Sequence, residues 1–301
     1  MEFIDIDVKP LYQEEGEKGI NRLIERAGRT CYKSTDRITD DSADIFVGRM
    51  IKNEHYAMLE HGTVYLIIPD GTHSWLVDIF MGNKYTKCRK HDGNTYITTN
   101  LRVIVENEFL NKNYHYYLVD KPSEFHPKRL TINFKCSIGV SRETNRHRVN
   151  SMAEESTRYI NYMREKFGAI LKFVNLKYIL GKSYDEKVNE ECTNTDLPTL
   201  SDIALSRESS ELFDNPIFWF IYSFKVAELS YSNLMRLGLQ PQQAKRVLPL
   251  GLSSELCHTA FIDDWEHFLN LRYFEKTGAV DPEMKAVATK IHEIVEHYKA
   301  M

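Results

Sequence analysis

Two β-rich runs, about sixty residues apart, constrain the fold of this chain more than any other feature of its sequence. Residues 63–69 read TVYLIIP, and residues 130–136 read LTINFKC. β-Branched and aromatic side chains are frequent in both runs and favour an extended backbone. We expect the two runs to pair as strands of one sheet. The intervening residues 70–129 are rich in Asn, Tyr and Lys, with turn signals at 82–83 and 92–93.

Helical periodicity marks much of the remaining chain. A strand is predicted over residues 2–8, and the polar residues 181–210 predict a long, partly irregular connection. Helices are predicted over 15–29, from 39–40 to about 51, and over 72–80, 100–109, 139–146, 216–237 and 265–274, with two more beginning at Pro241 and after Asp281-Pro282. The short helix at 139–146 would place Arg142 and Arg146 on one face.

Charge and composition exclude several classes of protein. Hydrophobic residues make up 42% of the 301 residues, which is enough for a substantial core. The net charge is −4 and the pI about 6.3, whereas a dedicated nucleic-acid binder usually has a basic domain. We therefore expect neither DNA nor a membrane as a partner. A local basic pocket on an acidic protein suits a small anionic substrate better.

The cysteines indicate a reducing compartment. There are five of them, scattered and without a CxxC pair, which is typical of free thiols and not of a disulfide framework or structural zinc. The first residues lack a basic stretch followed by an apolar one, and no run of 18 apolar residues occurs. We expect a soluble, cytoplasmic protein.

Residues 146–158, RHRVNSMAEESTR, concentrate the chemistry of this chain. They hold three arginines, one histidine, two glutamates and three hydroxyl side chains. Arginine binds phosphate in a bidentate manner and stays charged at any working pH, so the segment suits a small anionic ligand. The alternative is a solvated helix face, because Asn150, Glu154 and Arg158 follow the i,i+4 spacing of surface charge pairs.

The order of these residues resembles the signature of the flavin-dependent thymidylate synthases. That family carries Arg-His-Arg, seven residues and then Ser, which here runs from Arg146 to Ser156. Three further blocks resemble the family in the same order: residues 55–61 (HYAMLEH), 242–249 (QQAKRVLP) and 265–272 (WEHFLNLR).

The resemblance implies both an activity and a fold. Members convert dUMP to dTMP by reductive methylation, with 5,10-methylenetetrahydrofolate as carbon donor and NADPH as reductant through FAD. They are homotetramers whose active sites combine residues of several subunits. The implied fold is α/β of the α+β type, a twisted, mainly antiparallel sheet flanked by helices. We expect one domain over residues 1–301, with an insertion at about 70–129 between two strands, because compact members join such strands tightly.

The resemblance also assigns residues to ligands. Arg272 matches the arginine that stabilises charge on the uracil, which makes it the expected catalytic residue. The implied dUMP-binding residues are Arg142, Glu143, Thr144, Asn145, Arg146, Glu154, Glu155, Ser156, Thr157, Arg158, Lys245 and Arg272. The implied FAD-binding residues are His55, Ala57, Glu60, Arg146, His147, Arg148, Glu154, Phe261, Asp263 and His267. No metal site is expected, since His55 and His61 lie six residues apart, which suits no common zinc spacing.

Several positions depart from the family pattern. Glu143 stands where many members have Gln, and Lys245 replaces an Arg, which removes the bidentate fork. Ala57 replaces a hydroxyl residue near the flavin. The segment 261–263, Phe-Ile-Asp, replaces an Asn-x-Arg segment that binds FAD, so Asp263 would repel a pyrophosphate.

Three functional hypotheses follow. The first is a flavin-dependent thymidylate synthase; the second is a relative that performs another one-carbon transfer, such as hydroxymethylation, on a pyrimidine nucleotide. The third is a non-enzymatic nucleotide or RNA binder. Within the first, Ser156 is expected to position the substrate, because a lone serine needs a base for activation. Cys257, followed by His258, is the rival nucleophile, although a buried cysteine is more often packing.

Overall fold

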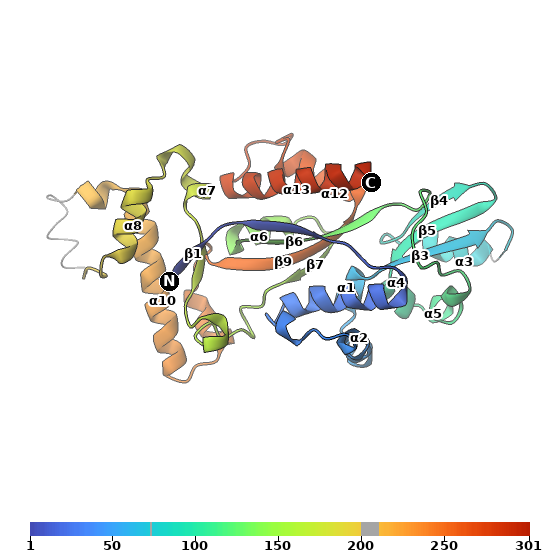
Figure 1. Cartoon of the computed structure of the whole chain (residues 1–301), viewed down its shortest axis with the longest axis horizontal. Helices are drawn as coiled ribbons and strands as arrows, with labels where there is room; N and C mark the ends of the chain where they lie inside the picture. The colour runs from blue at the N-terminus through green and yellow to red at the C-terminus, as the bar shows by residue number, and fades with distance from the viewer. Residues whose placement is uncertain (73, 200–210) are drawn as a thin grey trace.

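The computed structural model describes residues 1–72, 74–199 and 211–301 as a mixed α/β protein with three small sheets flanked by helices (Figure 1). Among the described strands, all pairings are antiparallel except that of β1 (Glu2–Ile4) with β8 (Lys172–Val174). The expected fold class, a mainly antiparallel α/β arrangement flanked by helices, is thereby confirmed. The expected strand over 2–8 is divided, because a second strand, β2 (Asp7–Leu11), joins a different sheet.

The central sheet has four strands in the order β2, β6 (Arg129–Ser137), β9 (Ser253–Phe261) and β7 (Ser151–Glu154). Side chains alternate between the two faces of such a sheet. On one face, the apolar residues of β6 and β9 form the main core with the C-terminal helices; these residues are Leu130, Ile132, Phe134, Cys136, Leu256 and Ala260. On the other face, polar side chains such as Thr131 and Asn133 lie toward the first helix.

Helices cover both faces of this sheet (Figure 1). On one side lie α12 (Ile262–Arg272) and α13 (Pro282–Ala300), and on the other lies α1 (Gly16–Thr30), against which α2 (Ser42–Lys52) packs. Helix α13 begins where Asp281 accepts hydrogen bonds from the first-turn backbone N–H groups of Glu283 and Met284.

A second sheet corrects the predicted strand pairing. Strand β3 (Thr63–Pro69) pairs along its whole length with β5 (Asn94–Asn100), which also pairs with β4 (Lys87–His91). Residues 130–136 pair instead with β2 and β9. The run 94–100, NTYITTN, carries β-branched and aromatic residues itself and lies closer along the chain, so it closes a shorter loop than 130–136 would.

The remaining residues between β3 and β6 form short helices. These are α3 (Ser74–Met81), α4 (Leu101–Val105) and α5 (Glu108–Asn113). The single helix predicted over 100–109 is wrong, because the Asn107 side chain accepts from the N–H groups of Phe109 and Leu110 and begins a new helix there. That 70–129 is an insertion into a single domain stays a prediction.

A third group of elements lies at the other end of the molecule (Figure 1). It contains α10 (Pro216–Arg236), α8 (Glu186–Asn194), α7 (Lys177–Leu180) and α11 (Pro241–Ala244). The helices predicted over 15–29 and 216–237 agree closely with α1 and α10. The connection predicted over 181–210 includes α8, and its last residues, 200–210, lie outside the described part. No helix of the described residues combines the length and the apolar character needed to cross a bilayer.

Candidate active site around Arg272

Helix α6 (Ile138–Thr144) carries the first cationic residues of the candidate site. The side chain of Ser137 caps the helix by accepting from the N–H of Val140. The helix ends at Thr144, so Arg146 lies in the following turn and does not share a helical face with Arg142 as predicted. Both arginines and Arg148 are exposed, and none of them forms an ion pair with any residue in the described ranges. They leave three charges available to an anion.

Arg272, in the last turn of α12, reaches back to α6. It donates to the carboxylate of Glu143 at 2.7 Å and to the backbone carbonyl of Glu143 at 3.4 Å. The Arg272 side chain is only 21% exposed. Its Nε is buried and has no hydrogen-bond partner among the described residues. The structure therefore joins two predicted dUMP-binding residues and leaves one buried donor of Arg272 unused.

His147 is buried beside this ion pair. Its ring centroid lies 6.0 Å from that of His267 and 4.8 Å from that of Phe268. Burial, followed by the positive charge of Arg272 and the neighbouring His267, lowers the pKa of His147 to about 4. The imidazole is therefore neutral at pH 7. Its Nε2 has no hydrogen-bond partner in the described part of the chain.

Glu154, at the end of β7, connects the signature segment to the sheet. Its carboxylate accepts from Ser254 at 3.0 Å and from the amide of Asn145 at 3.4 Å. The pairing of β7 with β9 brings these side chains together, since Glu154 lies opposite Leu256. Arg272 interacts with Glu143 and His147, and Asn145, which follows α6, joins Glu154 to the same turn; we call these five residues the Arg272 cluster. Asn150, between its members in sequence, is buried with its amide unsatisfied among the described residues.

Glu155 turns to different neighbours. It forms an ion pair with Lys33 at 2.8 Å and accepts from the hydroxyl of Tyr162 at 2.9 Å. Burial raises its pKa, although the charge of Lys33 acts in the opposite direction. Glu155 lines a separate cleft of about 610 Å³ that also includes Thr30 and Glu255. The structure therefore does not place Glu155 within the Arg272 cluster.

The end of the signature segment also lies apart from the cluster. The N–H of Ser156 donates to the carbonyl of Cys31 at 3.0 Å, and Arg158 is exposed with its guanidinium 5.1 Å from the ring of Tyr159. Thr157 is half-buried, and the hydroxyl of Thr144 is used by its own helix. Lys245 follows α11 in a short 3-10 turn. Neither Arg158 nor Lys245 contacts the Arg272 cluster within the described part of this chain.

The predicted flavin residues fall into two groups, of which one is near η2 (Tyr56–His61). His55 and Ala57 are exposed at its start, and Glu60 forms an ion pair with Arg102 at 2.6 Å. His61 is wholly buried, with its Nδ1 2.7 Å from the hydroxyl of Thr259, as a core residue would be.

Arg129 links this group to the second one, which lies where β9 meets α12 and includes Phe261 and Asp263. It donates to the carbonyl of Glu60 at 2.7 Å and to the hydroxyl of Ser151 at 3.1 Å. Its guanidinium also lies 5.8 Å from the ring of Phe261. Burial lowers the pKa of Arg129 to about 10, so it remains charged at pH 7. The sequence reasoning missed this residue; the only signal was a charge directly before the apolar strand.

Asp263, the most unfavourable departure, has a cationic partner. Lys87 lies 2.5 Å from its carboxylate. Lys87 belongs to β4 and was not predicted from the sequence, where no motif marks it. The positive charge beside Asp263 opposes the repulsion that this carboxylate would exert on a phosphate.

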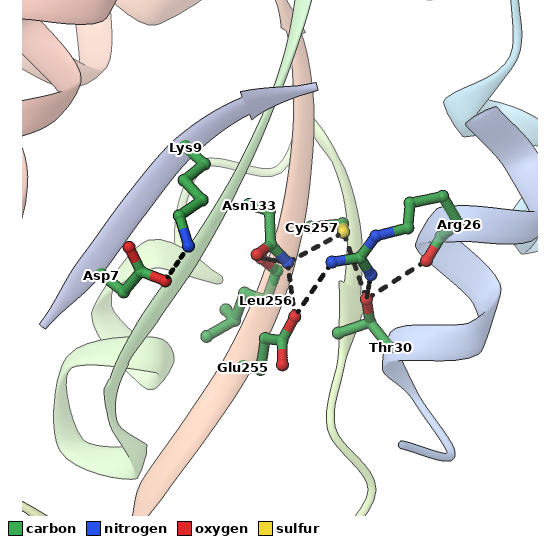
Figure 2. Close-up of polar contacts among 8 residues, drawn as sticks. All are labelled: Asp7, Lys9, Arg26, Thr30, Asn133, Glu255, Leu256 and Cys257. Carbon is green, nitrogen blue, oxygen red and sulfur yellow. Dashed lines mark hydrogen bonds and ion pairs between the residues drawn. The ribbon is translucent and has the colours of Figure 1, made fainter. Parts of the chain in front are cut away.

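The rival nucleophile does not have the surroundings of one. Cys257 lies 3.3 Å from the hydroxyl of Thr30 and 3.3 Å from the amide of Asn133, with Glu255 linking Asn133 to Arg26 (Figure 2). Burial raises the pKa of this thiol, which lowers the fraction of reactive thiolate. His258 cannot serve as its base, because it lies on the opposite face of β9, 4.5 Å from Trp265.

The donors around Arg272 fit an anionic nucleotide or a flavin dinucleotide. Three unpaired arginines can contact phosphates, and Arg272 and His147 hold buried nitrogens without partners in the described ranges. Buried polar groups without partners are uncommon in folded proteins and require an explanation. A bound ligand or a neighbouring subunit would supply the missing acceptors.

The sequence matches one family of known proteins. The family described as "thymidylate synthase complementing protein" matches residues 90–298, which is more than half of the chain and includes all the motif blocks except 55–61. No curated protein matches the sequence. Solved structures of a UMP/dUMP methylase, PolB from Streptomyces cacaoi, align over most of both chains.

The alignment with PolB is distant. The structure bound with 5-Br dUMP has 15% identity and a TM-score of 0.43, and the alignment covers 100% of this chain and 98% of that chain. The structure bound with 5-Br UMP has 16% identity and a TM-score of 0.40, with 98% and 90% covered. Likeness at this level carries no argument about activity.

Proposed function

Because the chain belongs to the thymidylate synthase complementing protein family, we propose that it is a flavin-dependent thymidylate synthase. The reaction is the reductive methylation of dUMP to dTMP, with 5,10-methylenetetrahydrofolate as carbon donor and NADPH as reductant. The observation that carries this proposal is the Arg272 cluster. In it the mostly buried Arg272 forms an ion pair with Glu143 beside a neutral histidine, and Arg142, Arg146 and Arg148 have no ion-pair partner among the described residues.

The proposed role of Arg272 follows from charge. C5 of uracil is a poor nucleophile, so negative charge must build up on the carbonyl edge of the ring. A fixed cation in a site with little water stabilises such charge better than water does. Glu143 holds the Arg272 guanidinium in place at 2.7 Å, and the part of the Arg272 side chain that remains exposed, 21%, is the part that would meet a uracil carbonyl.

The cofactor would lie along the signature segment. FAD, when bound, supplies the hydride that reduces the transferred carbon. Arg146 and Arg148 are exposed and unpaired among the described residues, and would bind its phosphates as bidentate donors. His147 is neutral at pH 7, so it would contact the flavin as a hydrogen-bonding or stacking group and not as a cation. Arg129 would hold Glu60 and Phe261 in position for the same ligand.

The proposal includes a homotetramer. Arg158 and Lys245, the expected phosphate ligands, do not contact the Arg272 cluster within the described part of one chain. We propose that they complete the Arg272 cluster of a neighbouring subunit, as sites shared between subunits require.

One experiment separates the three hypotheses. Purified protein is incubated with FAD, its flavin absorbance is followed on addition of NADPH, and proton release is then measured from dUMP tritiated at C5 in the presence of 5,10-methylenetetrahydrofolate. A thymidylate synthase gives a bleached flavin band, tritium release and dTMP by mass spectrometry. Tritium release with a different one-carbon product would replace this proposal by the second hypothesis. Failure to take up FAD, with dUMP still bound, would leave a nucleotide binder.

A further inference from the structure

Lys87 makes three contacts at the beginning of α12. Its ammonium lies 2.5 Å from the carboxylate of Asp263, 3.2 Å from that of Asp264 and 4.6 Å from the ring centroid of Phe261. Phe261 and Asp263 are both residues to which we assign flavin contacts. Lys87 belongs to β4, whose register partners are on β5, so it reaches them from a different sheet. The segment 70–129 therefore contacts the proposed cofactor site directly.

Stability alone does not account for this arrangement. Asp263 is 67% exposed and Lys87 28% exposed, and ion pairs between such side chains contribute roughly 0–1 kcal/mol to folding. The electrostatic consequence is larger. The adjacent carboxylates of Asp263 and Asp264 would repel the phosphates of a dinucleotide bound beside Phe261. Among the described residues, Lys87 forms an ion pair with each of these two carboxylates.

Arg129, the other cation near Phe261, attracts Asp264 through its charge but is not placed to donate to a ligand. Arg129 is buried, and its terminal nitrogens already donate to Thr63, Glu60 and Ser151. A lysine ammonium carries three N–H donors; Asp264 accepts one of them at 3.2 Å, and Asp263 is held as an ion pair. One donor of Lys87 remains for a ligand oxygen at the edge of the site.

We propose that Lys87 is a binding determinant for the flavin cofactor: it neutralises Asp263 and Asp264 and donates to a phosphate beside Phe261. The inference rests on the proposed function, and it deepens it by giving segment 70–129 a part in the cofactor site. Lys87 comes from a segment distant along the chain. It acts at the first turn of α12, whose charged residues are Asp263 and Asp264.

A charge-removal series tests the inference. The dissociation constant of FAD is measured by the quenching of flavin fluorescence, and the Tm of the cofactor-free protein is measured for each variant. Lys87→Met keeps much of the apolar stem on Phe261 and should weaken FAD binding by about tenfold, because one charge interaction near the phosphates is lost. Lys87→Arg should bind FAD within about twofold of the unchanged protein, since it preserves the charge. The matched control is Lys90→Met, an exposed lysine of the same strand, which should leave FAD binding unchanged.

A second pair of variants examines the mechanism. Asp263→Asn with Asp264→Asn removes the repulsion and should tighten FAD binding. In that background, Lys87→Met should cost less than it does in the original protein, because two charges no longer need to be neutralised. The double asparagine variant also provides the test if Lys87→Met lowers the Tm.

The outcomes distinguish the inference from the function on which it rests. If the unchanged protein binds FAD and Lys87→Met binds it equally well, the inference is wrong and the function stands. Equal losses in Lys87→Met and Lys90→Met, or no gain in the double asparagine variant, would also overturn the inference. If the unchanged protein does not bind FAD at all, the proposed function itself fails.

Discussion

The ion pair between Arg272 and Glu143 allows charge and geometry to be tested separately at one residue. Arg272→Ala removes the cation that would stabilise charge on the uracil and should reduce kcat at least about 100-fold. Arg272→Lys retains the charge but loses the planar fork, so it should recover part of that rate. The stability should change little, because Glu143 is 35% exposed and stays hydrated when its partner is lost.

Steady-state kinetics with dUMP, together with the Tm of each variant, check this prediction. Glu143→Gln keeps the shape of the partner while removing its charge, so it tests whether the ion pair itself is needed to hold Arg272. A near-normal kcat for Arg272→Ala would show that another group activates the uracil.

His147 does not contribute positive charge to this site at neutral pH. With a pKa of about 4, its imidazole carries no charge at pH 7, and the same burial that keeps it neutral leaves its Nε2 without a partner among the described residues. Charge on a bound phosphate must therefore be balanced by arginines and lysines. The exposed Arg142, Arg146 and Arg148 are the available ones near the Arg272 cluster.

At the scale of elements, Arg129 connects η2, β7 and the end of β9. It bonds to Glu60 and Ser151 and lies over Phe261. Arg129→Met keeps much of the side-chain volume but leaves the Glu60 carbonyl without its donor; the hydroxyls of Thr63 and Ser151 also lose a donor but can rotate toward other partners. We expect the free energy of unfolding to fall by about 2 kcal/mol, the cost of one buried acceptor left unpaired.

Urea denaturation measures this change, and FAD binding should weaken as η2 loses its attachment. Arg89→Met, an exposed arginine of β4, is the control and should leave both quantities unchanged. If Arg129→Met were as stable as the unchanged protein, the buried cation would be replaceable by apolar packing, as some buried charges are.

The elements differ in how far they could be predicted. The two long helices α10 and α13 follow from local signals: both have proline at the first helical position and an Asn or Asp cap before it. Strand pairing is not local. β3 and residues 130–136 are both rich in β-branched and aromatic residues, yet β3 pairs with β5. The sequence of β5, NTYITTN, is more polar, so its strand is harder to predict. Which strands pair depends on loop closure and on packing, and neither can be read from the composition of a strand.

The candidate site shows the same limit. A motif reveals residues that lie close in sequence, so the stretch from Arg146 to Arg158 could be identified. Lys87 and Arg129 belong to no motif, because each acts through a contact between separate sheets or strands. The separation of Glu154 from Glu155 also depends on tertiary structure: Glu154 is the last residue of β7, and Glu155, directly after the strand, turns to different neighbours.

At the scale of the whole molecule, the position of Arg158 decides how many chains make a site. Arg272 lies with Glu143 and His147, whereas Arg158 lies against Tyr159, and no contact joins the two within the described residues. A site that needs both arginines would then draw them from two subunits. This gives a quantitative prediction for mixed oligomers.

Arg158→Ala and Arg272→Ala should each be inactive alone but partly active together. If one subunit supplies Arg158 and its neighbour supplies Arg272, an equal mixture that is unfolded and refolded together contains both arginines in about a quarter of its sites. Activity should therefore recover to about a quarter of that of the unchanged protein, and light scattering should report a tetramer. Each variant refolded alone is the control. A mixture that stays inactive, although the untagged variant co-purifies with a tagged copy of the other, would mean that both arginines must come from the same chain, and the shared site would have to be abandoned.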